Sequence, residues 1–458
     1  MALSPLEQFV GWHCSRPSTF EREGTDSLLT RPAFLPWLAL LAMAPFTLLA
    51  LGCEESAVAD TKSIENLPLL VAEEEMRIGD LDDPDYGFSR VVGVDIDDEG
   101  NIYVGEALVP EIRVYSPEGA LLRRIGRRGE GPGEFQRAPR FGVLGDTLWT
   151  LDNAPDRITL FDLHGNVLST GTADRVLVPL PSSIAHVLPW IMRPDGRFIS
   201  HLARVSSSRR DPPSGVKATD SIPVPFVLFD AAGAVTDTVG WAGRPPPRLW
   251  RPPSEYSSEM KSIDVGGSQR YVPQAPSGLP WWLPQVDGYV LIESPLAEAE
   301  DEGVLKLTRF DLAGDTVLSQ VLRYDPIPYS AEDLDSIAAR GARGEAGGML
   351  PFFIPGRPPP PDWEVIARRL RAEMDFPRFQ MPFEYPWAAR DGSIWLRWQD
   401  ADSQMARWIL IDADGCPQGK LELPLDHQIL WSRGDTFWAS DPDEFDVPWL
   451  VKYRIQPG

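Results

Sequence analysis

The feature that most constrains this chain of 458 residues is a two-part phrase that recurs after residue 90. It opens with a turn and an apolar strand, as in DEGNIYV at 98–104, and closes with an apolar strand and a turn, as in IRVYSPEG at 112–119. The opening half recurs at 144–149, 194–199, 286–292, 390–396 and 433–438, and the closing half at 158–165, 226–233, 307–314 and 408–415. Asp-Gly pairs supply the positive φ of tight turns, and β-branched and aromatic residues favour strands. The phrase therefore predicts consecutive hairpins.

A repeat of roughly 40–50 residues built from four short strands is typical of a propeller blade. The sixth copy is incomplete, because only one strand, at 449–455, follows Trp438. We expect the missing strand to come from 67–72 or 75–78, so that the ring closes without exposed edges. The predicted fold is all-β: a six-bladed β-propeller closed by an N-terminal strand, with a small helical insertion between blades four and five.

The first repeat is the most distinctive, with VDIDDEGNIYV at 94–104, EIRVY at 111–115 and IGRRGEGPGEF at 125–135. Together with LDNAPDRI at 151–158, these segments resemble the bacterial six-bladed β-propeller proteins related to NHL-repeat domains. The resemblance extends over most of the chain after residue 65. It implies architecture rather than activity, since propellers host lyases, lactonases and non-catalytic binding modules.

The N-terminal region predicts export and a lipid anchor. An apolar run at 34–52 resembles the h-region of a signal peptide, and ALGC at 50–53 resembles a bacterial lipobox. We expect 1–52 to be a signal-peptide region with an over-extended start, Cys53 to be lipidated, 53–64 to be a tether and 65–458 to be the propeller. An uncleaved membrane helix is the alternative, and it needs about 20 apolar residues without the prolines found here. The predicted location is the cell envelope, at the periplasm or the outer membrane.

Two insertions interrupt the repeat, at about 243–280 and 326–382. In the second, Ser330 and Asp333 resemble a capping box, which predicts the start of a short helix. Insertions of this length often form lids or binding loops, and a peripheral decoration is the alternative. Arginines that include Arg368 gather in the second insertion, where they either hold an anionic ligand or form the solvated face of a helix.

Catalytic motifs are largely absent from the sequence, which has five histidines but no pair of them at metal-ligand spacing. A site is expected at the ring axis, where Glu106, Asp152, Asn153 and His201 follow strands that we interpret as innermost. The six-bladed lactonases, which the fold resembles, hold a divalent cation there, so Glu106, Asp152 and Asn153 are candidate metal ligands and His201 is a candidate ligand-binding residue. Hydrated carboxylates are the alternative. The calcium-loop spacing at 95–106 is better explained by a strand, a turn and a strand.

Trp281 and Trp282 either offer an aromatic platform to a sugar or peptide, or pack between blades. The net charge of −24 disfavours nucleic acid and anionic lipid, unless one mouth of the ring is locally basic. The predicted function is an extracytoplasmic, lipid-anchored module that binds a protein or small-molecule ligand as a monomer, without cofactor or evident catalysis. The alternative is a Ca²⁺-dependent hydrolase or lyase with its site at the central mouth.

Overall fold

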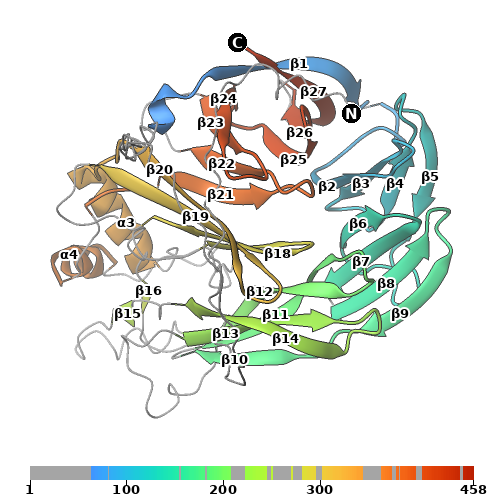
Figure 1. Cartoon of the computed structure of the whole chain (residues 1–458), viewed down its shortest axis with the longest axis horizontal. Coiled ribbons are helices and arrows are strands. Elements are labelled where there is room, and N and C mark those ends of the chain that lie inside the picture. Colours follow the sequence, from blue (N-terminus) through green and yellow to red (C-terminus); the bar gives the residue numbers. More distant parts are fainter. Residues whose placement is uncertain are drawn as a thin grey trace, which may run out of the picture.

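The computed structural model describes residues 63–80, 82–153, 156–180, 183–207, 222–244, 249–250, 270–271, 281–294, 302–343, 363–373, 378–380, 382–398, 405–443 and 447–458. The expected signal peptide, the lipidated Cys53 and most of the expected tether and first insertion lie outside these ranges. In the described parts, the regular structure is mostly β (Figure 1).

Sheets of mainly antiparallel strands follow one another around a ring in chain order, so the fold is all-β and propeller-like (Figure 1). The first sheet contains β2 (Val91–Ile96), β3 (Ile102–Glu106), β4 (Ile112–Tyr115) and β5 (Leu121–Ile125). The second contains β6 (Arg140–Leu144), β7 (Thr147–Asn153), β8 (Asp156–Asp162) and β9 (Val167–Thr172). The third contains β10 (Val176–Leu180), β11 (Ser183–Met192), β12 (Phe198–Ser207), β13 (Ile222–Phe229) and β14 (Val235–Arg244).

The fourth sheet contains β17 (Trp281–Gln285), β18 (Gly288–Glu293), β19 (Gly303–Asp311) and β20 (Thr316–Tyr324), and a short pair, β15 (Leu249–Trp250) and β16 (Arg270–Tyr271), precedes it in the chain. The last sheet has eight strands in the order β21, β22, β23, β24, β1, β27, β26, β25. Their bounds are β21 (Phe383–Ala388), β22 (Ile394–Trp398), β23 (Met405–Ile411), β24 (Pro417–Pro424), β1 (Leu69–Ile78), β25 (Gln428–Arg433), β26 (Thr436–Pro442) and β27 (Pro448–Pro457).

The N-terminal strand β1 lies between two strands from the other end of the chain (Figure 1). It pairs antiparallel with β27, from Leu70 opposite Pro457 to Ile78 opposite Leu450. It also pairs parallel with β24, where Leu70 lies opposite Leu421. The two segments expected to supply a strand, 67–72 and 75–78, are thus largely parts of one strand.

The strands that line the centre of the ring are the first long strand of each four-stranded unit. The strand β2 contacts β6 and β25, β11 contacts β6 and β17, and β17 contacts β21. The sequence-based interpretation of β3, β7 and β12 as innermost is therefore wrong, because these are second strands. They stand out in the sequence because neighbours cover them on both sides, as the complete burial of β3 illustrates.

Aromatic residues of the second strands pack between neighbouring sheets, among them Trp149, Trp395 and Trp438, which are all buried. The ring of Trp149 lies edge-on to that of Phe198 in the next sheet, with 5.7 Å between centroids. Burial of such large side chains at each junction holds the sheets together, since one aromatic side chain removes on the order of 150–250 Å² from water.

Turns in both halves of the repeat share one hydrogen-bonding device. The first aspartate of the turn accepts hydrogen bonds from the backbone N–H groups two and four residues ahead, at Asp97, Asp162, Asp230 and Asp311. A glycine with positive φ follows, for example Gly100 at 88° and Gly165 at 92°. The Asp97 carboxylate therefore belongs to a β-turn, which confirms the strand, turn and strand interpretation of 95–106.

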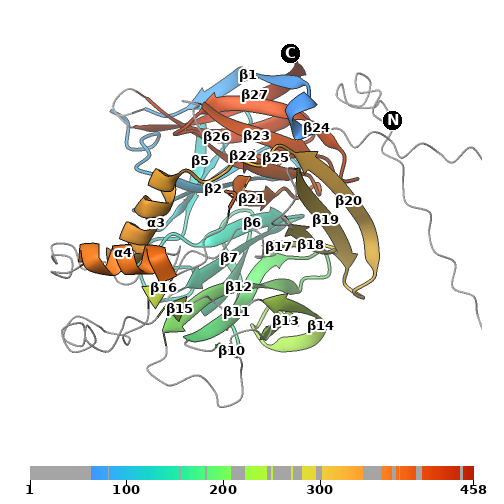
Figure 2. The same ribbon diagram turned by 90° about the vertical axis from the view of Figure 1, so that its left-hand side faces the viewer.

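The second insertion forms two helices, α3 (Ala331–Arg343) and α4 (Trp363–Glu373), between β20 and β21. They pack on each other at one margin of the molecule (Figures 1 and 2), and Leu370 of α4 is buried. The predicted capping box is confirmed: the Asp333 N–H donates to Ser330 Oγ at 3.1 Å, and the Ser330 N–H donates to Asp333 Oδ2 at 2.9 Å. Across the described residues, we find no helix whose length and apolar character suffice to span a membrane.

Candidate functional site

Glu106, an expected metal ligand, ends β3 as part of a buried ion pair. Its Oε2 accepts from Arg113 Nη2 at 3.1 Å, and the two side chains are 4% and 5% exposed. Its Oε1 accepts from the Ser89 N–H at 3.0 Å, while Arg113 Nη1 donates to the Gly87 carbonyl at 2.7 Å. The pair thus fastens the segment that leads into the innermost strand β2.

Asp152 repeats this arrangement in the second sheet. Its Oδ2 accepts from the Gln136 N–H at 3.1 Å and from Arg157 Nη2 at 3.4 Å. Arg157 Nη1 donates to the Glu130 and Gly131 carbonyls at 2.8 and 3.2 Å. Again, a carboxylate at the end of a second strand and an arginine on the third strand hold the segment before an innermost strand.

Asp441 of β26 forms a third such clamp, which sequence reasoning missed. Its Oδ1 lies 3.0 Å from His427 Nε2, and its Oδ2 accepts from Arg77 Nη2 at 2.7 Å. In the second sheet, the strand partner of Asp152 is Arg157, but the strand partner of Asp441 is Trp449. The arginine therefore comes from β1, and its guanidinium lies 5.7 Å from the centroid of the Trp449 ring.

A spacing in the sequence marks all three carboxylates. Each follows, by three residues, an aromatic residue of the second strand: Tyr103 before Glu106, Trp149 before Asp152, and Trp438 before Asp441. We call these three carboxylates and their arginines the carboxylate clamps. Their repetition in separate sheets indicates a role in joining each blade to the segment before it.

The clamps do not fit a calcium site. A calcium ion needs six to eight oxygen ligands around one point, but Glu106 and Asp152 belong to different sheets and each faces an arginine guanidinium, whose charge repels a cation. Within the described residues, no group of three or more His, Cys, Asp and Glu side chains is placed to hold a metal. The side chain of Asn153 lies outside what the structure describes.

The candidate ligand-binding residues occupy separate parts of the fold. His201 lies in β12 opposite Leu188, and Trp281 and Trp282 open β17; the side chains of these three residues lie outside the described set. Arg368 is exposed on α4, in the helical insertion at the margin of the molecule. The structure thus places these residues on three different elements, and whether they bind a ligand stays a prediction.

A buried aspartate joins four elements near the centre of the ring. Asp95 Oδ2, on β2, accepts from the Val143 N–H of β6 at 2.7 Å and from Arg390 Nη2 at 2.9 Å, and its Oδ1 accepts from Trp431 Nε1 of β25 at 3.1 Å. Burial raises the pKa of the Asp95 carboxyl, and the positive charge of Arg390 opposes that shift. These contacts cross from the first sheet to the second and the last, and they fix the centre of the ring.

Three arginines lie at the end of the ring where β2 and β6 begin. Arg90 precedes β2, Arg137 precedes β6, and Arg140 opens β6; all three are exposed. No ion pair of theirs involves any residue that the structure describes. We call these residues the arginine set. It places three positive side chains at this end of the ring, where a locally basic mouth was the condition for an anionic partner.

Arg140 is the most constrained member of the arginine set. Its guanidinium carbon lies 3.1 Å from the centroid of the Trp190 ring, on the neighbouring innermost strand β11. Although solvent still reaches the side chain, the surrounding protein removes enough water that desolvation lowers the pKa of Arg140 to about 10. A cation that is stacked on an aromatic face and has no carboxylate partner among the described residues is chemically suited to an incoming anion.

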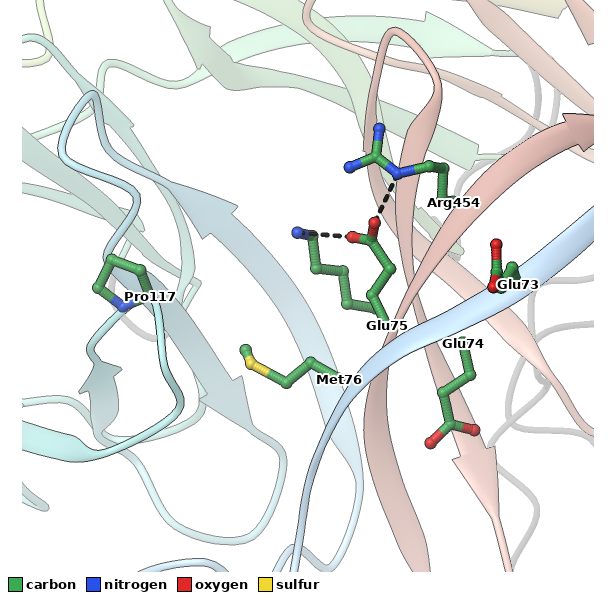
Figure 3. A pocket seen from close by; sticks show the side chains of 7 residues that line it. Glu73, Glu74, Glu75, Met76, Pro117 and Arg454 are labelled. Carbon is green, nitrogen blue, oxygen red and sulfur yellow. Dashed lines mark hydrogen bonds and ion pairs between the residues drawn. The ribbon is translucent and has the colours of Figure 1, made fainter.

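One hollow on the described surface is a shallow, open groove of about 610 Å³ between β1, β27 and the turn before β5 (Figure 3). Its charges largely satisfy one another, since Glu75 bonds both Lys452 and Arg454 (Figure 3). The hydrogen bond from Lys452 is the main cause that lowers the pKa of Glu75. The groove therefore offers few unpaired groups to a ligand.

No protein-family model matches the chain, and no curated protein matches it. Among solved structures, a Bacteroides fragilis protein described as exported is 11% identical, with 84% of this chain and 95% of that chain covered and a TM-score of 0.40. Virginiamycin B lyase from Staphylococcus aureus is 11% identical, with 84% and 99% covered and a TM-score of 0.32. Regucalcin from Agrobacterium tumefaciens is 12% identical, with 83% and 95% covered and a TM-score of 0.30. Likenesses this distant identify no activity for this chain.

Proposed function

We propose that the chain is an exported, lipid-anchored, six-bladed propeller that binds a ligand or protein partner at one end of its ring, without catalysis of its own. The count of six treats the eight-stranded sheet as two blades. One blade consists of β21, β22, β23 and β24, and the other consists of β25, β26, β27 and β1. The strand order supports this division, because β1 joins the two halves and contributes the outermost strand of the last blade. The relationship to NHL-repeat domains belongs to the same proposal.

The observation that carries the binding role is the arginine set at the start of β2 and β6. Other arginines of the ring have acceptors in the described structure: Arg113 and Arg157 bond carboxylates, and Arg390 bonds Asp95. The three arginines of the set are exposed and have no ion pair with a described residue, in a chain whose net charge is −24. Surface charge that serves only solubility would not be expected to place three such arginines at the same end of two adjacent innermost strands.

Two measurements test the proposal. The soluble chain that begins at Glu54 is screened by thermal unfolding against metals, neutral sugars, cationic peptides and anions; binding to the folded state raises the unfolding temperature. Failure of every class to shift it contradicts a binding role for small ligands, and a Ca²⁺ shift revives the hydrolase alternative. Fractionation of cells that express the full chain with Cys53→Ser tests the anchor, because the variant should leave the detergent-extractable membrane fraction.

A further inference from the structure

The innermost strands β6 and β11 carry a stacked pair, Arg140 and Trp190. The carboxylate clamps and Asp95 already join the sheets around it. Glu106 at the end of β3 and Asp152 on β7 are engaged with other arginines, since Glu106 bonds Arg113 and Asp152 bonds Arg157. The positive charge of Arg140 is therefore left uncompensated within the described structure.

Stacking decides which groups of Arg140 remain available. With its carbon 3.1 Å from the Trp190 centroid, one face of the guanidinium is covered by the indole. The N–H groups lie in the guanidinium plane, at its edge, so stacking leaves them free to donate. The indole also restrains the rotation of the long side chain, so that less conformational entropy is lost when a ligand binds.

The planar set of N–H donors in a guanidinium matches a ligand group that presents two oxygens side by side, as a planar carboxylate or a tetrahedral phosphate does. Carboxylate and phosphate groups both accept two parallel N–H···O bonds from arginine, and such charge-assisted bonds are about twice as strong as neutral ones. Arg90 and Arg137, which share this end of the ring, add attraction at longer range. These three side chains repel a cationic ligand, and their hydrogen bonds to a neutral ligand lack the strengthening that a negative charge supplies.

We propose that Arg140, held on Trp190, is the anchor of a binding site for a small oxyanion, a molecule that presents a carboxylate or phosphate group to the end of the ring where β2 and β6 begin. This inference rests on the proposed binding function and names its ligand class. Arg140 binds the oxyanion, and Trp190 positions the guanidinium.

Calorimetric titration of the soluble chain with citrate and, separately, with inorganic phosphate tests the site, in buffer with 20 mM and with 150 mM chloride. The variants are Arg140→Gln, which removes the charge, Arg140→Lys, which keeps the charge without the fork, and Trp190→Leu, which removes the platform. Lys306→Gln is the matched control, because Lys306 is an exposed cation on β19, away from the innermost strands. Thermal unfolding of each variant checks that it is folded.

We expect Arg140→Gln to weaken oxyanion binding at least tenfold, Arg140→Lys and Trp190→Leu to weaken it by about threefold to tenfold, and Lys306→Gln to change it less than twofold. Comparison of citrate with phosphate shows which oxyanion the site prefers. Equal losses in Arg140→Gln and Lys306→Gln overturn the inference in favour of bulk charge. An absence of oxyanion binding at millimolar concentration overturns it too; if a neutral or cationic ligand then stabilises the chain, the proposed binding function survives without it.

Discussion

The buried pair of Glu106 and Arg113 distinguishes a structural clamp from a metal site. In Glu106→Gln, the guanidinium loses its charged partner but keeps its bonds to Glu111 Oε1 at 3.0 Å and to the Gly87 carbonyl at 2.7 Å. Breaking a buried pair costs about 3–5 kcal/mol, and the two remaining acceptors place the expected loss of unfolding free energy at about 2–3 kcal/mol. With an unfolding entropy of about 0.8 kcal/mol/K for a chain of this size, the melting temperature should fall by about 3 °C.

A double-mutant cycle isolates the interaction itself. Arg113→Met leaves the Glu106 carboxylate buried with the Ser89 donors, at an expected cost of about 3–5 kcal/mol. The double variant Glu106→Gln/Arg113→Met should be more stable than the sum of the single losses predicts, by at least about 1 kcal/mol. Denaturant unfolding supplies the four free energies, and Glu118→Gln, an exposed carboxylate in the same sheet, is the control, with a change below about 0.5 kcal/mol.

Two results would refute this reasoning. Additive losses within about 0.5 kcal/mol would show that the two side chains do not stabilise one another. A melting temperature that rises with Ca²⁺ in the wild type and not in Glu106→Gln would show that the carboxylate serves a metal instead.

Three further predictions concern the ring and its turns. Gly126→Ala should lower the unfolding free energy by about 3 kcal/mol in denaturant titration, because φ is +80° and the new Cβ would lie 2.1 Å from the Phe135 ring. Gly145→Ala, where φ is +54° and no atom lies within 4 Å of the new Cβ, should lower it by about 1 kcal/mol. Equal losses in the two variants would contradict the packing argument. Burial raises the pKa of Tyr103 to about 12, so the contribution of its phenol to the unfolding free energy is present below pH 10 and lost as the pH rises towards 12. Tyr103→Phe should flatten the fall in unfolding free energy between pH 10 and 12. A fall that is unchanged in the variant would be inconsistent with a buried phenol. Deletion of 63–78 removes β1 and exposes the edges of β24 and β27, so light scattering should show aggregation of the truncated chain; a monomeric, cooperatively unfolding product would show that β1 is dispensable.

The sequence determined the local elements of this protein, because their causes are local. An aspartate that accepts from backbone groups two and four residues ahead, followed by a glycine with positive φ, forms its turn wherever it occurs, as at Asp97 and Gly100. The capping box of Ser330 and Asp333 is local for the same reason. Repetition of these turns with apolar strands was sufficient to predict an all-β propeller-like ring.

Which strand faces the centre, and what each polar side chain meets there, was decided only by the tertiary structure. The partners of Asp95 come from β6, from Arg390 and from Trp431, which is 336 residues further along the chain, and no spacing in the sequence reveals such contacts. The same holds for Glu106 and Asp152, whose carboxylates alone suggest metal ligands, whereas the structure pairs them with Arg113 and Arg157. Arg140 is one of many arginines in the sequence, and only the approach of β6 to β11 sets it on Trp190 without an acidic partner in the described structure. Charge compensation depends on distances between side chains, and the ring sets those distances.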